Sequence, residues 1–276
     1  MVHGLGGNAL NWMAVGPRLA QDHRALAIDL AGFGRTPLFQ RSAAVGANAQ
    51  LAVDFIEKVI GEPVVLMGNS MGGHIGILVA ADHPDRVRQL VLVDPAVPGM
   101  PTRRPEAAMI GAAAALSIPG LVETVLDRRT RLLGPERLVD EVLAIVSAEP
   151  SRVDPEVRQA HIELTEERMG LGSQNHRALV QASRSIGLRM ADPRFWTKVK
   201  AVQAPTLVVH GELDHVIPLH AARELVRRRP DWTLEVIGGA GHVPMLETPE
   251  RFLEVVRGWL AREMASEPMA VAVSEA

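Results

Sequence analysis

The sequence predicts an α/β protein in which helices flank a mostly parallel sheet and an all-helical segment interrupts it. Two observations predict this fold class. Short apolar runs alternate with amphipathic helical patterns in both terminal parts of the chain, which is the rhythm of strand–helix–strand units in a parallel sheet. Between these parts, from residue 98 to 196, the pattern is helical only, and prolines divide it into several helices.

The strands are predicted where β-branched and aliphatic residues form short runs. Val64, Val65 and Leu66, for example, lie in a run that suits a parallel strand covered on both faces. The predicted strands are residues 24–28, 63–67, 90–93, 206–209 and 233–237. The helices predicted to cover them are residues 45–60, 71–82, 219–229 and 249–262, of which the last has a proline in its first turn.

The domain organisation follows from the interruption of this rhythm. Residues 1–97 are predicted to form the first part of the sheet domain, and residues 197–264 its second part. Residues 98–196 are the helical insertion, which we expect to act as a mobile cap. Residues 265–276 have neither helix-capping residues nor a periodic apolar face, and we expect them to form a flexible tail.

The composition excludes several classes of protein. The chain has 276 residues, of which 47% are hydrophobic and 22% charged, as in ordinary globular proteins. The absence of cysteine excludes disulfide scaffolds, thiol nucleophiles and cysteine-ligated metal sites. With 29 basic and 32 acidic residues and 3% aromatics, no nucleic-acid partner is expected. Neither a membrane span nor a signal peptide is recognisable, so we expect a cytoplasmic protein, with its oligomeric state left open.

The strongest chemical signal is the Gly-x-Ser-x-Gly motif of residues 68–72, which lies between a predicted strand and a predicted helix. In that context, Ser70 sits at a sharp turn and projects its hydroxyl from the sheet at a helix N-terminus. The small residues on either side let the strand and the helix approach closely. Ser70 is therefore the candidate nucleophile. The alternative is a glycine-rich turn in which the serine only caps the helix.

A nucleophilic serine needs a base, and the base needs an orienting acid. His242 follows the last predicted strand after a flexible glycine-rich loop, and is the candidate base. Asp214 follows the preceding strand at the same edge of the sheet, and is the candidate acid. Glu212, close to Asp214, and Asp94, at the end of the strand at residues 90–93, are rivals for the acid.

These motifs resemble those of the α/β-hydrolase fold superfamily, and in particular its serine hydrolases with a helical cap. The chain order Ser, Asp, His is the order of that fold. The resemblance extends to the motifs at residues 3–7, 29–36 and 241–244, and covers nearly all of the chain outside the cap. It implies that the backbone N–H groups of Leu5 and Met71 form an oxyanion hole, where each donor would contribute on the order of 3 kcal/mol to the transition state.

The resemblance also raises a question about the start of the chain. The family places its oxyanion loop after the third strand of the sheet, but here His3 is the third residue, and only Met1 and Val2 remain of that strand. We therefore expect the N-terminal strands to be missing, and the natural gene to encode a strand-forming segment before Met1. Unpaired backbone groups cost about 1–3 kcal/mol each when buried, so we expect the chain as it stands to fold poorly and to show little activity.

Three functions are compatible with these motifs. The first is hydrolysis of a carboxylic ester or thioester through an acyl-enzyme. The second is carbon–carbon bond hydrolysis of the meta-cleavage type, which the residues around Ser70 resemble and in which Asn69 would contact the substrate. Val243 stands where that group usually has an aromatic residue, and residues 4–7 differ from its usual oxyanion loop. The third is a non-catalytic hydrolase-fold protein or an inactive N-terminally truncated fragment.

The expected partner is a small-molecule substrate with an apolar part. The run at residues 112–115 could form an apolar roof over it. A cap arginine that would bind a substrate carboxylate is to be sought among Arg158, Arg168 and Arg184. No metal and no cofactor is expected, because the three neighbouring histidines fall on a strand, a loop and a helix rather than on one helix face. These are His210, His215 and His220.

Overall fold

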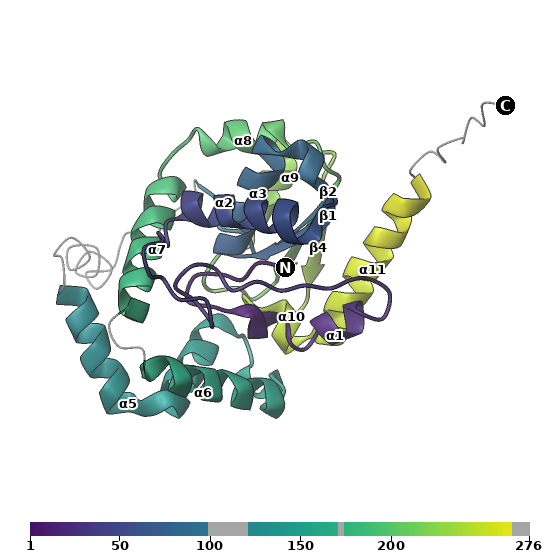
Figure 1. Ribbon diagram of the computed structural model, residues 1–276. Coiled ribbons are helices and arrows are strands. Elements are labelled where there is room, and N and C mark those ends of the chain that lie inside the picture. Colours follow the sequence, from purple (N-terminus) through teal and green to yellow (C-terminus); the bar gives the residue numbers. More distant parts are fainter. Residues whose placement is uncertain (99–120, 171–173, 267–276) are drawn as a thin grey trace.

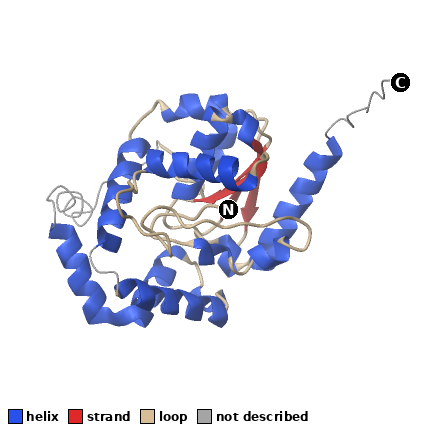
Figure 2. Ribbon diagram, in the orientation of Figure 1, coloured by secondary structure: helices blue, strands red, loops and turns tan. Residues whose placement is uncertain are grey.

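A parallel four-stranded sheet with helices on both faces forms the centre of the molecule (Figures 1 and 2). The computed structural model describes residues 1–98, 121–170 and 174–266. The strands follow one another in the order β1-β2-β3-β4. Their bounds are Val64–Asn69 (β1), Val87–Val93 (β2), Thr206–Gly211 (β3) and Thr233–Ile237 (β4). Each lies within a few residues of its predicted position, and the predicted parallel direction is confirmed.

Two hydrophobic clusters cover the two faces of the sheet. Successive residues of a strand point to opposite faces, so Leu90 and Leu92 of β2 belong to one cluster, and Val91 and Val93 to the other. The first cluster is covered by α2 (Val45–Phe55, continued by the π-helical turn Ile56–Ile60), α3 (Met71–Asp82), α8 (Phe195–Ala201) and α9 (His220–Arg228). The second is covered by η1 (Ala9–Trp12), α1 (Gly16–Leu19), α10 (Pro244–Glu247) and α11 (Pro249–Ser266). Two short 3₁₀ turns, Pro84–Arg86 and Pro150–Arg152, complete these elements.

The inserted segment is helical wherever it is described. Its helices are α5 (Leu121–Val146), α6 (Pro155–Met169) and α7 (Gln174–Met190), which lie along the left and lower side of the molecule in Figure 1. Gly134, with φ of 74°, breaks α5 into two helical parts. The predicted apolar run at residues 112–115 lies outside the described residues. α8 spans the predicted boundary at residue 196 and packs against α3 in the sheet domain.

The first residues of the chain lie inside the fold (Figure 1). Val2 is 1% exposed and makes parallel bridges to Ile28 on one side and to Gly68 of β1 on the other. The Met1 amino group donates a hydrogen bond to the Leu26 carbonyl at 2.7 Å. These two residues therefore act as a short piece of strand beside β1, which aligns the following loop with the carboxyl edge of the sheet.

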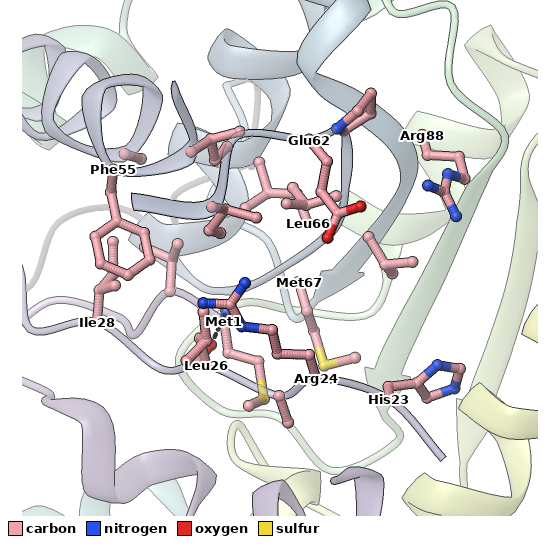
Figure 3. A pocket seen from close by; sticks show the side chains of 18 of the residues that line it. Met1, His23, Arg24, Leu26, Ile28, Phe55, Glu62, Leu66, Met67 and Arg88 are labelled. Carbon is pink, nitrogen blue, oxygen red and sulfur yellow. Dashed lines mark hydrogen bonds between the residues drawn. The ribbon is translucent and has the colours of Figure 1, made fainter. Parts of the chain in front are cut away.

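A cavity of about 270 Å³ lies between residues 24–28 and the amino end of β1 (Figure 3). Leu26, Ile28 and Met67 contribute apolar side chains to its lining, and Arg24 and Glu62 charged ones. Val2 holds the two segments one strand's width apart, because it pairs with both. The prediction of a strand at residues 24–28 is therefore wrong: in the described chain only Ile28 has a ladder partner, and that partner is Val2.

The C-terminal helix is longer than the sequence pattern predicts. α11 continues to Ser266, so the first two residues of the expected tail are helical, and residues 267–276 lie outside the description. None of the described helices is both long enough and apolar enough to cross a bilayer.

Gly211 offers a test of how closely the sheet packs against the loop after β4. A Cβ at Gly211 would lie 2.0 Å from the Gly241 carbonyl oxygen, so Gly211→Ala should lower the free energy of unfolding by about 3 kcal/mol. Gly187 is exposed in α7, and nothing lies within 4 Å of an added Cβ. Gly187→Ala should therefore stabilise the protein by about 0.5–1 kcal/mol. Urea unfolding of both variants checks this, and equal effects would contradict the packing described.

Candidate active site

The turn between β1 and α3 holds Ser70 in a strained conformation. Its φ of 55° and ψ of −115° are unusual for a residue with a side chain. The Ser70 N–H donates to the Val93 carbonyl at 2.9 Å, and its carbonyl accepts from the Ala96 N–H at 3.1 Å. A Cβ at Gly68 would lie 2.2 Å from the Gly72 carbonyl oxygen, so the two motif glycines are required for the close approach of strand and helix.

The loop after Val2 lies directly against this turn. A Cβ at Gly72 would lie 2.3 Å from the Val2 carbonyl oxygen, and one at Gly4 would lie 3.1 Å from the Ser70 Cβ. Leu5 and Met71 therefore carry their N–H groups on the two backbone segments that flank Ser70. Neither N–H donates to an acceptor in the described part of the chain. The arrangement leaves both free to bind an oxyanion at the serine.

His3 fixes the backbone of that loop. Its Nδ1–H donates to the Gly4 carbonyl at 2.7 Å, and its Nε2 accepts from the Leu30 N–H at 3.1 Å. Because Nε2 accepts, the ring must be neutral. Burial lowers the pKa of His3 to about 4, which keeps it in this form near neutral pH.

Asp214 and His242 form a buried hydrogen-bonded pair. The His242 Nδ1 lies 2.7 Å from the Asp214 Oδ2. The Asp214 Oδ1 accepts from the N–H groups of Val216 and Ile217, at 2.7 and 2.9 Å. Burial alone would raise the pKa of Asp214, but the hydrogen bond and charge of His242 and the Ile217 N–H together bring it below its ordinary value. An ionised Asp214 keeps the proton of His242 on Nδ1, which leaves Nε2 as the basic nitrogen.

Two buried polar residues tie the His242 loop to the rest of the molecule. The Asn69 amide donates to the His242 carbonyl at 3.1 Å and to the Val93 carbonyl at 3.2 Å. The Glu247 carboxylate accepts from the N–H groups of Gly241 at 2.9 Å and Ala148 at 2.8 Å. Asn69, predicted as a possible substrate contact, thus joins the serine turn to the loop of the candidate base.

Glu247 was not singled out by sequence reasoning. It ends the short helix α10, outside every recognised motif, where it resembles an ordinary helical residue. The signal that could have drawn attention to it is an acidic residue among apolar neighbours, five positions after His242. The His242 N–H donates to the Val146 carbonyl at 2.7 Å, so the end of α5 is bonded to the same loop.

The two rival acids have other partners. Glu212 is exposed, and its carboxylate accepts from the Gly239 N–H at 3.2 Å. Asp94 is fully buried, and its Oδ1 accepts from the Gly211 N–H at 2.9 Å. Of these three acids, Asp214 is the one that accepts a hydrogen bond from the His242 Nδ1–H.

One group of side chains in the described residues has the spacing of a metal site. Asp94, His210 and Asp214 each offer a ligand atom within 4.8 Å of the others. The His210 Nε2, however, donates to the Ile217 carbonyl at 2.9 Å, and both Asp214 oxygens already accept hydrogen bonds. The His210 Nε2 and both Asp214 oxygens are therefore already engaged in hydrogen bonds to other groups. His215 and His220 do not belong to the group.

The three candidate arginines of the cap differ in their surroundings. Arg158 pairs with Asp140 at 2.7 Å on the surface, and Arg184 is exposed. Arg168 is partly buried and donates to backbone carbonyls of the loop at residues 29–36. Arg168 therefore binds the cap helix α6 to the sheet domain.

Comparison with known proteins identifies chains that share these features. A model of the alpha/beta hydrolase family matches residues 1–255. A 2-hydroxymuconate semialdehyde hydrolase of Pseudomonas sp. (strain CF600) is 30% identical over 280 aligned residues, which cover 96% of this chain and 87% of the relative. A pimeloyl-[acyl-carrier protein] methyl ester esterase of Aeromonas hydrophila subsp. hydrophila is 25% identical, with 93% of this chain and 92% of the relative covered.

Among solved structures, a thermophilic esterase from Thermogutta terrifontis is similar to this chain with a TM-score of 0.70 and 26% identity. The match covers 95% of this chain and 88% of the esterase. The similarity therefore spans the sheet domain and the cap.

The buried His3 predicts a loss of stability in acid. Its pKa is about 4 in the folded chain and about 6.5 when unfolded, so only the unfolded chain binds a proton between these values. Lowering the pH from 7 to 5 should therefore cost about 2 kcal/mol at this residue. In His3→Gln, which does not titrate, the drop in unfolding free energy between pH 7 and 5 should be smaller by that amount. The exposed His23→Gln is the control, and identical pH dependence in all three proteins would contradict the prediction.

Proposed function

The chain belongs to the alpha/beta hydrolase family, as its motifs predict, and from this premise we propose that it is a serine hydrolase that cleaves a carboxylic ester or thioester. The observation that carries the proposal is the buried 2.7 Å hydrogen bond between His242 and Asp214, beside the strained turn of Ser70. In this proposal, Ser70 is the nucleophile, His242 the general base and Asp214 the acid that orients it.

The reaction proceeds in two halves. The Ser70 Oγ attacks the substrate carbonyl while the His242 Nε2 takes its proton, and the oxyanion accepts hydrogen bonds from the N–H groups of Leu5 and Met71. Collapse of the tetrahedral intermediate expels the alcohol or thiol, which receives that proton from His242, and leaves an acyl group on Ser70. Water, deprotonated by His242, then attacks the acyl-enzyme and releases the acid. Asp214 stays ionised throughout and stabilises the imidazolium.

A carbon–carbon bond hydrolase is the second candidate, because the relative at 30% identity is named as a 2-hydroxymuconate semialdehyde hydrolase. The geometry around Asn69 favours the ester reaction. Asn69 is 2% exposed, and its amide nitrogen donates to two backbone carbonyls. An amide nitrogen has two donors, so both are already used, and none remains for a dienol substrate.

The substrate class can be tested with a panel of compounds. We expect turnover of p-nitrophenyl esters, in a series from acetate to palmitate, and slower or no turnover of a ring-cleaved dienol. The series also measures the length of the apolar part that the site accepts. A higher kcat/KM for the dienol than for every ester would favour the second candidate. No turnover of either class would favour a non-catalytic protein.

Replacement of the nucleophile tests the proposal most directly. Ser70→Ala should lower kcat by on the order of 10⁶, and a fluorophosphonate probe should label Ser70 in the wild-type protein only. Ser42→Ala, at an exposed serine before α2, is the matched control and should keep full activity and labelling. Labelling at another serine, or activity in Ser70→Ala, would overturn the assignment.

Replacement of the acid distinguishes Asp214 from Glu212. Asp214→Asn should lower kcat by about 10⁴, because the amide favours the wrong tautomer of His242. Glu212→Asn leaves His242 and its partner unchanged, and should keep kcat within about twofold, as an exposed substitution does. Measured kcat values for the two variants in the reverse order would move the acid to Glu212.

A further inference from the structure

A second layer of buried polar groups lies behind the Asp214–His242 pair. Asp94, just after β2, and His210, in β3, are both 0% exposed. Asp94 has a φ of 46°, and in the described residues only Phe39 and Ser70 share a positive φ among residues other than glycine. Such backbone strain persists where the surrounding structure fixes a side chain in place. Here the Asp94 carboxyl accepts from the Gly211 N–H at 2.9 Å and lies within 4.8 Å of a carboxyl oxygen of Asp214.

The hydrogen bonds of Asp214 leave one acceptor position open. A carboxylate oxygen accepts about two hydrogen bonds. The Asp214 Oδ1 already accepts from the N–H groups of Val216 and Ile217. Its Oδ2 accepts from the His242 Nδ1–H at 2.7 Å, so one lone pair of Oδ2 remains for a further donor.

Asp94 has an unpaired carboxyl oxygen in the neighbourhood of Asp214. Its Oδ1 accepts from the Gly211 N–H, whereas its Oδ2 is buried and has no partner. A carboxyl oxygen of Asp94 and one of Asp214 lie within 4.8 Å of each other. Two buried carboxyl groups this close disfavour ionisation of both, which favours a proton on one of them. Asp214 has three hydrogen-bond donors that favour its anion, and Asp94 has one.

His210 does not supply the missing proton. Its Nε2 lies 2.9 Å from the Ile217 carbonyl oxygen and therefore donates to it. Its Nδ1 lies 3.4 Å from the Asp94 Oδ1 and has no hydrogen-bond partner. Burial lowers the pKa of His210 below its ordinary value, which leaves a neutral ring with a lone pair, not an N–H, on Nδ1. His210 therefore offers no N–H to either carboxyl group, and the donor counts favour Asp94 as the protonated one.

We propose that Asp94 is a positioning residue that carries a proton and donates it in a hydrogen bond to the Asp214 Oδ2, so that Asp214 is the single carboxylate behind His242. Its effect on the reaction rests on the proposed function, whereas the protonation of Asp94 does not. Burial and then the charge of Asp214 raise the pKa of Asp94 well above its ordinary value. The other titratable groups that act on this cluster are His210, His220, His242 and Glu247.

The hydrogen bond from Asp94 sets the basicity of the pair. A donor on Oδ2 draws electron density from Asp214 and makes His242 a weaker base, while it fixes Oδ2 in line with the His242 Nδ1. Loss of the donor would therefore make His242 a stronger base and loosen its orientation. If Asp94 were instead ionised, a neutral residue at position 94 would remove a negative charge and make His242 a weaker base.

These two cases change the basicity of His242 in opposite directions, so the pH dependence of kcat/KM distinguishes them. Asp94→Asn keeps a neutral donor of the same shape, so the acid limb of the profile should stay where it is in the wild type. Asp94→Leu removes the donor, so the limb should move to higher pH and kcat should fall about tenfold, as for a lost hydrogen bond to a charged group. The exposed Asp85→Asn is the control, and should match the wild type. A shift to lower pH in Asp94→Asn would mean that Asp94 is ionised, and would overturn the proposal.

Infrared difference spectroscopy tests the proton without any activity. The wild-type protein at pH 7 should show the C=O stretching band of a protonated buried carboxyl group, and Asp94→Asn should lack it. Asp85→Asn should keep the band. Absence of the band in the wild type, or its persistence in Asp94→Asn, would overturn the proposal even if Asp94→Leu fails to fold. An inactive wild-type protein that shows the band would overturn the proposed function and leave the protonated Asp94 in place.

Discussion

The candidate site depends on close contacts between backbone segments. At these contacts one residue is a glycine, and an added Cβ atom would overlap the opposite segment. Gly72 lies against the Val2 carbonyl, Gly68 against Gly72, and Gly211 against the Gly241 carbonyl. These contacts bring the loop after Val2, the serine turn and the histidine loop to one edge of the sheet, although they lie far apart in the sequence. Dense packing of this kind leaves few alternative arrangements, so the positions of Leu5, Ser70 and His242 follow from it.

The electrostatics of the site depend on the burial that this dense packing produces. Burial lowers the pKa values of His3 and His74 to about 4, so both rings are neutral near pH 7. The His74 Nδ1 is bonded to the Ala96 carbonyl, and its ring stacks on Phe195 of α8. Asp214 has three hydrogen-bond donors that stabilise its negative charge. An ionised Asp214 beside the His242 Nδ1 gives that ring a defined tautomer.

Much of this architecture was accessible from the sequence, because its signals are local. The glycines around Ser70 and the continuous apolar runs of the strands can be recognised in short windows. The family and the fold class predicted from them are confirmed. The strand at residues 24–28 was wrongly predicted because pairing depends on a distant partner, which a local pattern does not contain. Glu247 was missed for the same reason: its importance lies in N–H groups about a hundred residues away.

The Glu247 contacts have a consequence for the way the cap and the sheet domain can vary. One carboxylate bonds both the histidine loop and the residues just after α5, at Ala148 and Glu149. The end of α5 is therefore held to the histidine loop, whereas the break at Gly134 lies a full helical segment earlier. A chimeric protein that receives a different helical insertion would keep His242 in place only if the graft ends upstream of Val146, so that Glu247 retains the N–H donors of Ala148 and Glu149.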